Sequence, residues 1–458
     1  MTTHWCLISH PTEPRVLLAQ RPGGWMLPEI ATSDAPAMRQ ELRQRYGLDA
    51  TLLTSVAGRF LDAEHDEEEH VYALECHGVA PALPPAARWA TLAELAALAP
   101  EPVAYRPASE QWLRELAGAP VPAQRAPWAR RGWYAEAAAW LVERLATLGY
   151  QAIGAVEQVH ARGWSTVLRV PAHTGWIYFK AVAGGGFAFE PLLTRALARR
   201  CGGQVPAIVA VDEARHWLVT EDAGPALLGS ARADPAAATA VLARALAEYA
   251  RLQQVTAPVV DEWIAATGCP DRRLERLPAL YRALVDDRAA LLVGEPGGLS
   301  AADHARLRAG APAVADLCAR LAGYRLPSAT IHHEELSPTH IIPNGERTIY
   351  FDWGDSCVTH PLASLMMALR WPRLVLGWDA ATLDRLRDAY LDAWTAWEPL
   401  ERLREAAALA DRVALLCRAL TWHAVTTHAE PGARWEYADR APYWLALFLH
   451  GEEQAPAP

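Results

Sequence analysis

The apolar positions of the chain follow a helical period in one stretch and a strand period in several others. Between Trp128 and Leu148 they recur every three or four residues, which predicts a helix with one apolar face. Pro127 near its first turn and Gly149 just past its end are common residues at helix boundaries. The predicted apolar face consists of Trp133, Ala137, Trp140, Leu141, Leu145 and Leu148.

Runs of β-branched and aromatic residues predict strands after this helix. The runs lie at 156–159, 166–170, 176–182, 208–211 and 217–220. A helix is predicted from Glu190 to Arg200. From about Pro235 onward the pattern is mainly helical, except for short strand and loop signals from Ile331 to Trp353. Strands followed by a long helical part predict an α+β fold.

The segment 118–127 is the best candidate for a linker, because it is rich in small residues and proline and has no periodicity. It separates a first domain, residues 1–117, from a strand-containing part, 128–225, and a helical part, 226–450. Residues 451–458 are expected to form a disordered tail. The acidic run at 62–70 is expected to be a solvated hairpin loop rather than a metal cluster.

Composition narrows the classes of function. The net charge of −10 argues against nucleic acid or an anionic membrane as the main partner. The seven cysteines are scattered and show no CxxC spacing, which indicates reduced, mostly buried thiols. The sequence shows no signal-peptide pattern and no apolar stretch long enough for a membrane span. We therefore expect a cytoplasmic protein.

One lysine, Lys180, stands among 43 lysine and arginine residues. It lies in the predicted strand 176–182. An ammonium group is a compact charge with three donors, whereas guanidinium is a broad planar fork, so a lysine suits a narrow site that grips phosphate oxygens. A lysine on a strand is the usual phosphate anchor of the kinase fold. The alternative is a coding bias that left one lysine by chance.

The most specific spacing lies between residues 333 and 355. Segment 333–342 reads His-Glu-Glu-Leu-Ser-Pro-Thr-His-Ile-Ile, and 349–355 reads Ile-Tyr-Phe-Asp-Trp-Gly-Asp. Together they resemble the catalytic loop and metal-binding strand of the aminoglycoside phosphotransferase family and its small-molecule kinase relatives. The resemblance covers about residues 128–450. It implies a bilobal, protein-kinase-like domain with a small β-containing lobe and a large helical lobe.

The resemblance also implies a role for individual residues. Glu335 would be the catalytic base, and Asp352 and His340 would contact Mg²⁺, or Mn²⁺ as the alternative ion. Lys180 would grip the phosphates of ATP, and Glu190 would orient Lys180. The remaining nucleotide contacts would come from a turn over the phosphates and from a hinge, at Ser165, Glu221, Asp222 and Ala223. A register one residue earlier would put Glu334 at the base position, but it loses the leucine and proline matches.

Two residues depart from the family pattern. Glu335 stands where the family has aspartate, which displaces the carboxylate by roughly 1 Å. His340 stands where the family has asparagine, and imidazole is a poor ligand for Mg²⁺. Despite these two departures, the resemblance predicts a phosphotransferase that acts on a hydroxyl of a small molecule. A non-catalytic pseudokinase remains the alternative, and aminoglycosides, amino alcohols, sugars and nucleosides all remain open as acceptors.

The first domain resembles a Nudix domain. The resemblance rests on segments 16–28, 37–48 and 88–95, which look like the domain's entry, its helix and its closing tryptophan and helix. Glu41 remains on the helix, but Gln44 and Arg45 occupy places where paired acids belong. One carboxylate beside an arginine cannot hold Mg²⁺ in the usual way. We expect this domain to serve ligand binding, regulation or packing rather than hydrolysis.

Overall fold

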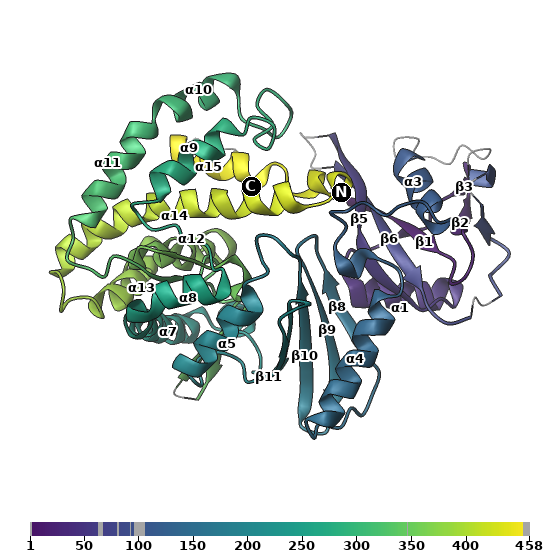
Figure 1. The fold of residues 1–458 in the computed structure, drawn as a ribbon, viewed down its shortest axis with the longest axis horizontal. Helices are drawn as coiled ribbons and strands as arrows, with labels where there is room; N and C mark the ends of the chain where they lie inside the picture. The colour runs from purple at the N-terminus through teal and green to yellow at the C-terminus, as the bar shows by residue number, and fades with distance from the viewer. Residues whose placement is uncertain are drawn as a thin grey trace. The chain divides into compact units, whose positions relative to one another are not determined.

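The computed structural model describes residues 2–62, 67–79, 82–91, 93–95, 106–345 and 347–451. The chain forms two compact units. Unit 1 consists of Met1–Ala183 and His428–Tyr437, and unit 2 consists of Gly184–Thr427 and Ala438–Pro458. Both contain helices and strands, so the fold is mixed α and β (Figure 1).

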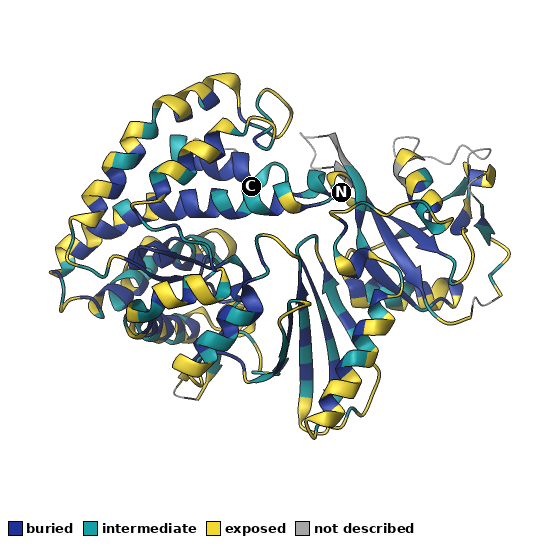
Figure 2. Ribbon diagram, viewed as in Figure 1, coloured by how far each residue is buried: buried dark blue, intermediate teal, exposed yellow. Residues whose placement is uncertain are grey.

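Unit 1 begins with a seven-stranded mixed sheet. Its strands are β1 (Thr2–Ser9), β2 (Val16–Arg21), β3 (Gly24–Met26), β4 (Glu29–Ile30), β5 (Ala50–Asp62), β6 (Glu67–Cys76) and β7 (Ala87–Ala90). The central strand β1 runs parallel to β6 and antiparallel to β2 and β4. Leu7, Ile8 and Leu18 are fully buried in this sheet, which is largely dark blue in Figure 2.

Two helices accompany this sheet, α1 (Ala35–Tyr46) and α3 (Arg106–Leu116). Helix α1 corresponds to the predicted helix at 37–48. Asp34 caps its first turn by accepting a hydrogen bond from the Ala37 amide, and Gly47 ends it with φ of 69°. The β5–β6 pairing runs up to Asp62 and Glu67. The tip of the acidic run, residues 63–66, lies outside the described residues, as does most of the predicted tail, 452–458.

The second part of unit 1 is an antiparallel ribbon with a helix against it. The ribbon comprises β8 (Glu157–Ala161), β9 (Ser165–Ala172) and β10 (Gly175–Val182), which confirms the strands predicted there. The Phe179 ring of β10 lies 6.1 Å from Trp133 and 6.0 Å from Trp140 of α4 (Trp133–Thr147). The carboxamide of Gln158 on β8 bonds both the amide and the carbonyl of Leu52 on β5, at 2.8 and 2.7 Å.

The start of the predicted helix 128–148 is wrong by about one turn. Pro127–Ala129 forms a separate 3₁₀ turn, and α4 begins only at Trp133. Gly132 adopts φ of 82°, a left-handed conformation that favours glycine and cannot lie inside a right-handed helix. The apolar period continues through the break because Trp128 and Trp133 are both buried.

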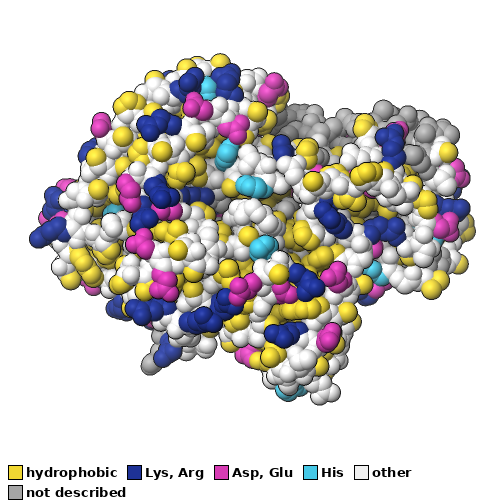
Figure 3. Space-filling view, viewed as in Figure 1, with side chains coloured by type: hydrophobic (Ala, Val, Ile, Leu, Met, Phe, Trp, Pro, Cys, Tyr) yellow, Lys and Arg dark blue, Asp and Glu magenta, His cyan; other side chains and the backbone are white. Residues whose placement is uncertain are grey.

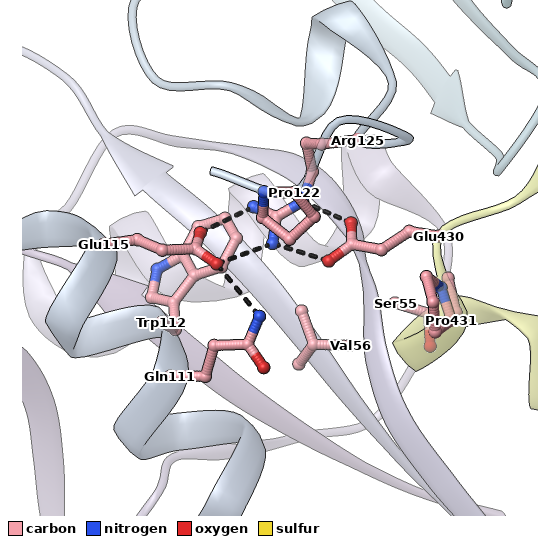
Figure 4. A pocket seen from close by; sticks show the side chains of 10 residues that line it. Ser55, Val56, Gln111, Trp112, Glu115, Pro122, Arg125, Glu430 and Pro431 are labelled. Carbon is pink, nitrogen blue, oxygen red and sulfur yellow. Dashed lines mark hydrogen bonds and ion pairs between the residues drawn. The ribbon is translucent and has the colours of Figure 1, made fainter. Parts of the chain in front are cut away.

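A segment from near the C-terminus, residues 428–437, also belongs to unit 1. Arg125 anchors it, donating to Glu430 at 2.8 Å and pairing with Glu115 at 3.1 Å (Figure 4). The same guanidinium lies 4.7 Å from the Trp112 ring. Nearby, a Cβ added to Gly58 would lie 2.0 Å from the Trp435 ring, so the strand accepts only glycine there.

Unit 2 is mainly helical around one apolar core. Its helices are α5 (Glu190–Arg200), α6 (Leu227–Ala233), α7 (Pro235–Thr256), α8 (Val260–Thr267), α9 (Leu277–Asp286), α10 (Ala301–Ala309), α11 (Ala311–Ala322), α12 (Leu365–Leu376), α13 (Ala380–Asp392), α14 (Leu400–His428) and α15 (Arg440–His450). Helix α5 has the bounds predicted for it. Much of α14 is buried (Figure 2), and Leu403, Val413 and Leu416 of this helix belong to the core.

The strands of unit 2 form three short antiparallel pairs. These are β11 (Ile208–Asp212) with β12 (Trp217–Glu221), β13 (Thr330–His332) with β16 (Cys357–Thr359), and β14 (Ile341–Asn344) with β15 (Arg347–Tyr350). Strands β13, β14 and β15 confirm the strand signals between Ile331 and Trp353, and β16 lies beyond that stretch. Two loops, 333–340 and 351–356, connect the last two pairs and carry most of the predicted site.

The cysteines, the charged surface and the helix lengths can be compared with what the composition predicts. All seven cysteines are buried free thiols, as predicted. On the face drawn in Figure 3, acidic and basic side chains are interspersed. Within the described ranges, no helix combines the length and the apolar character that crossing a membrane requires.

The Arg125 ion pairs give a first prediction. Replacing Arg125 by methionine leaves the carboxylates of Glu115 and Glu430 buried without their cation, and we expect it to lower the free energy of unfolding by about 3 kcal/mol. Urea unfolding followed by circular dichroism measures this. Arg114→Met is the matched control, because its pair with Glu110 is exposed and worth about 0.5 kcal/mol or less. Equal effects of the two changes would contradict the assignment.

Candidate active site

The two loops of the site are joined through His333. Its Nδ1 accepts a hydrogen bond from the Glu335 amide at 3.2 Å, so its Nε2 carries the proton and donates to the Phe351 carbonyl at 2.9 Å. Burial, with His340 nearby, lowers the pKa of His333 to about 4. The ring is therefore a neutral, fixed connector between the loop after β13 and the loop after β15.

Arg418 of α14 is the central cation of the site. Its guanidinium donates through Nη2 to Glu335 Oε1 and through Nη1 to Asp355 Oδ2, the latter at 2.5 Å. The side chain is 4% exposed. One buried arginine thus links the loop that carries Glu335 to the loop that carries Asp355. Burial would lower the pKa of Arg418, but these carboxylates raise it, so the charge is retained.

The two carboxylates on Arg418 titrate differently. Burial acts to raise the pKa of Glu335, but Arg418 and His340 outweigh it and leave this pKa below its usual value. Burial, together with the charge of Glu335, raises the pKa of Asp355 to about 7. The surroundings therefore favour the ionised form of Glu335 more strongly than that of Asp355.

Glu334 is held by a second buried arginine. Arg272, which lies before α9, donates to Glu334 and also to the Cys417 carbonyl at 2.7 Å and the Thr421 hydroxyl at 2.6 Å. Glu334 is 1% exposed, whereas the Glu335 side chain is 31% exposed. This difference favours the register in which Glu335, rather than Glu334, meets an acceptor.

Glu334 also belongs to a buried trio with His332 and Cys357, whose potential ligand atoms lie within 4.8 Å of one another. Burial raises the pKa of the Cys357 thiol, and it lowers the pKa of His332. Both groups are therefore neutral. The Arg272 guanidinium already supplies the positive charge beside Glu334. We therefore interpret the trio as buried packing next to the site rather than as a metal site.

His340 and Asp352 lie close together. The Nε2 atom of His340 is 3.6 Å from Asp352 Oδ2 and 3.8 Å from Glu335 Oε2. The Nδ1 atom of the same ring donates to the Glu335 carbonyl at 3.0 Å, so Nε2 is the atom that faces both carboxylates. The structure therefore brings together the predicted base and both predicted metal contacts.

Asp352 adopts an unusual backbone conformation, with φ of 66° and ψ of 65°. Few residues other than glycine occupy this left-handed region, and such strain concentrates at functional sites. The Asp352 side chain is 41% exposed. It offers hard oxygen atoms, which fit Mg²⁺ when substrate phosphates complete the shell. His340 offers nitrogen, which fits Mn²⁺ better than Mg²⁺.

Glu190 lies in the first turn of α5, 2% exposed, next to this loop. A Cβ added to Gly354 would lie 2.8 Å from Glu190 Oε2 and 3.7 Å from Asp352 Oδ1. Gly354 is thus required for the close approach of α5 to the Asp352 turn. Glu190, Glu335, His340 and Asp352 all lie in unit 2.

The other predicted residues lie on the β ribbon and near β12. Lys180 is half-buried on β10 and pairs with Val167 of β9, and Ser165 pairs with Val182. In unit 2, Glu221 ends β12 and Asp222 accepts a hydrogen bond from the Gly224 amide at 2.9 Å. Ala223 lies between Asp222 and Gly224 in the sequence. The roles of Lys180, Ser165, Glu221, Asp222 and Ala223 stay predictions.

The sequence reasoning missed Arg272 and Arg418. One signal was available for Arg418, because it stands in α14 among Leu415, Leu416, Cys417 and Ala419. A charged residue inside an apolar helical run must find a buried partner or leave the core. Nothing in the sequence identified Glu335 and Asp355 as those partners.

Comparisons with known proteins support a phosphotransferase domain. Residues 188–406 match the phosphotransferase enzyme family, which confirms the predicted resemblance over that range. The match includes Glu190, Glu335, His340 and Asp352 but ends before Arg418. A comparison with curated proteins finds no match. The resemblance of the first domain to Nudix proteins stays a prediction.

Several solved structures are similar to the chain. A choline/ethanolamine kinase family protein from Mesorhizobium loti shares 19% identity over 70% of this chain and 96% of that chain, with a TM-score of 0.46. Macrolide 2'-phosphotransferase type I shares 14% identity over 69% and 97%, with a TM-score of 0.44. An ethanolamine kinase from Plasmodium vivax shares 12% identity over 64% and 83%, with a TM-score of 0.46.

Buried neutral histidines make stability depend on pH. Burial lowers the pKa of His360 to about 3, while its Nδ1 accepts from the Leu362 amide at 3.3 Å. Because the unfolded chain binds the proton near pH 6.5, unfolding becomes easier as pH falls from there towards 3, by about 1.4 kcal/mol per pH unit for one proton.

We therefore expect His360→Asn to reduce the pH dependence of the unfolding free energy by about one proton between pH 6 and pH 4. Urea unfolding at a series of pH values measures the slope. An unchanged slope would show that His360 is protonated in the folded protein and would contradict its assignment as a neutral core residue.

Proposed function

We propose that the chain is an ATP-dependent phosphotransferase that transfers the γ-phosphoryl group to a hydroxyl of a small molecule. One observation carries the proposal: Glu335, His340 and Asp352 converge, with His340 Nε2 within 3.8 Å of both carboxylates. The match of residues 188–406 to the phosphotransferase enzyme family supports it.

Phosphoryl transfer depends mainly on positioning and charge neutralisation. Glu335 orients the acceptor hydroxyl and takes its proton as the hydroxyl oxygen bonds the γ-phosphorus. Bound ATP supplies the phosphoryl group, and the bond from the γ-phosphorus to the bridging oxygen breaks to leave ADP. A low pKa for Glu335 is compatible with this role, because the transition state is loose and the base is needed late.

The remaining roles concern the nucleotide. Asp352, with His340 as an auxiliary contact, would hold Mg²⁺ or Mn²⁺, and the ion would neutralise charge on the phosphates. Lys180 binds the phosphates and Glu190 orients Lys180. Ser165 covers the phosphates, and the backbone of Glu221, Asp222 and Ala223 contacts the adenine. We propose that these residues complete a kinase-like domain.

A second candidate, a non-catalytic binding module, is favoured by one observation. Arg418 bonds the Glu335 carboxylate, and a guanidinium on the base competes with an acceptor hydroxyl. In the Nudix-like domain the remaining acid, Glu41, is likewise occupied, by Arg45 at 2.7 Å and the Ala31 amide at 3.1 Å. We propose that this domain binds or packs without hydrolysing diphosphates.

Nucleotide binding tests the proposal without knowledge of the acceptor. We expect wild-type protein to bind ATP with Mg²⁺ or Mn²⁺ in calorimetric titration. We expect Lys180→Met and Asp352→Asn to weaken binding or turnover by about 100-fold, because each removes charge aimed at the phosphates. Asp316→Asn is the control, since Asp316 is an exposed carboxylate on α11. Unchanged binding in both test variants would reject the assignment.

Restoring the family residues separates an adapted enzyme from a decayed one. In Glu335→Asp/His340→Asn the shorter side chain draws the carboxylate back from Arg418, and displacement by about 1 Å can cost about 100-fold in rate. We therefore expect lower turnover of ATP with a panel of hydroxyl compounds. A gain of turnover in the double variant would favour the non-catalytic reading of the natural chain.

A further inference from the structure

A cavity of about 320 Å³ lies in unit 2 beside the candidate active site. Residues of the Asp352 loop, Gly354, Asp355 and Ser356, form one wall. Residues of α14, Leu420, Thr421 and Ala424, form another. Gly186 approaches α14 closely, because a Cβ added there would lie 3.3 Å from the Ala424 side chain. The volume is at the lower end of the range for small-molecule pockets.

One residue of the cavity wall, Asp355, is connected to the proposed base through Arg418. Asp355 lines the cavity, and its carboxylate shares the Arg418 guanidinium with Glu335. The two carboxylates are therefore bonded to neighbouring nitrogens of one planar group. The Asp355 wall of the cavity is therefore linked to the Glu335 carboxylate through a single guanidinium.

Most of the cavity wall is apolar. Phe187 and Phe189 are each 4% exposed, and with them stand Pro270, Leu280, Leu420 and Ala424. The Ser356 hydroxyl is buried and has no hydrogen-bond partner among the described residues. Such a wall excludes water and accepts an apolar body with few polar atoms.

The charged groups of the wall are already paired. Asp271 is bonded by Arg273 at 2.7 Å and by Arg276 at 3.1 Å, and Asp355 is bonded by Arg418 at 2.5 Å. Arg272, which also lines the cavity, is paired with Glu334. Both acids that line the cavity, Asp271 and Asp355, therefore have an arginine partner, although Arg273 also pairs with the exposed acids Asp261 and Glu275.

A cationic acceptor would meet, in the wall of this cavity, only carboxylates that already bond an arginine. It would lose its hydration and stand beside the Arg272 guanidinium. Aromatic rings can hold a cation, but phenylalanine does so less well than tryptophan, and the rings here are Phe187 and Phe189. An uncharged alcohol loses little on entry and gains contact with the apolar wall.

We infer that this cavity is the acceptor site and that it takes a small, uncharged, largely apolar alcohol rather than a cationic one. The inference rests on the proposed phosphotransferase function for its chemistry. The binding preference itself does not depend on that function, so the two can fail separately.

A matched pair of probes tests the inference. Choline and its carbon isostere, 3,3-dimethylbutanol, have nearly the same shape and the same hydroxyl and differ in charge. We expect saturation-transfer NMR, without nucleotide, to show binding of the alcohol to the full chain and binding of choline at least about tenfold weaker. Equal or tighter binding of choline would overturn the inference.

Two substitutions locate the binding. Ala424→Leu fills the cavity and is expected to weaken alcohol binding at least about tenfold. Ala408→Leu is the control, on an exposed position of the same helix. Should Ala424→Leu fail to fold, Leu280→Asp puts an acid on the half-buried wall of α9 and is expected to reverse the preference towards choline. Unchanged binding in a folded variant would overturn the location.

Phosphoryl transfer is measured in a separate assay, as the release of ADP from ATP. Alcohol binding without any ATP consumption by the wild type would reject the proposed function and leave the cavity's preference standing. ATP consumption with a cationic acceptor, together with no binding of the alcohol, would reject the cavity's preference and leave the function standing.

Discussion

The buried guanidinium of Arg418 is the interaction on which the candidate site depends. It lies in the core-facing part of α14 and bonds Glu335 on one loop and Asp355 on the other. Water solvates a charge far better than a protein interior does, so a buried arginine is tolerated only when carboxylates surround it. The helix position, the two loops and the ionisation of Glu335 are therefore parts of one electrostatic arrangement.

The backbone conformation of the Asp352 loop is constrained by the close packing around Gly354. The carboxylates of Glu190, in the first turn of α5, and of Asp352 both lie within 3.7 Å of the position that a Cβ at Gly354 would take. A side chain at Gly354 would collide with Glu190, and Asp352 itself occupies a left-handed conformation. Strain of this kind costs about 1–3 kcal/mol and persists only where the surroundings fix it. His333, which bonds Phe351 and Glu335, supplies part of that fixation.

Local elements and motif positions could be predicted from the sequence, because periodicity and spacing are local signals. Helix 190–200, the strands of the ribbon and the short strands around the motif were all identified. The break before α4 could be missed because the apolar period continues across it, and only the positive φ of Gly132 interrupts the helix. The convergence of Glu335, His340 and Asp352 followed from the motif spacing.

The partners of these residues could not be predicted in the same way. Arg272 and Arg418 lie 62 residues before Glu334 and 83 residues after Glu335, and such distant pairs are set by the packing of helices. The 428–437 segment shows the same limit, because no local pattern indicates that residues following α14 belong to unit 1. Sequence reasoning identified the candidate residues that the structure brings together, but it missed the arginines that pair with them.

Glu335 and Arg418 are best understood together. A glutamate in place of aspartate extends the carboxylate, and here the extended carboxylate reaches a buried arginine that also holds Asp355. A site that merely decays tends to leave buried charges without partners, since each substitution occurs without regard to the others. In this site the buried arginines both have carboxylates, and the carboxylates of Glu334, Glu335 and Asp355 each have a guanidinium. The buried charges of this site are therefore matched to one another, which is the arrangement expected if the proposed site is adapted rather than decayed.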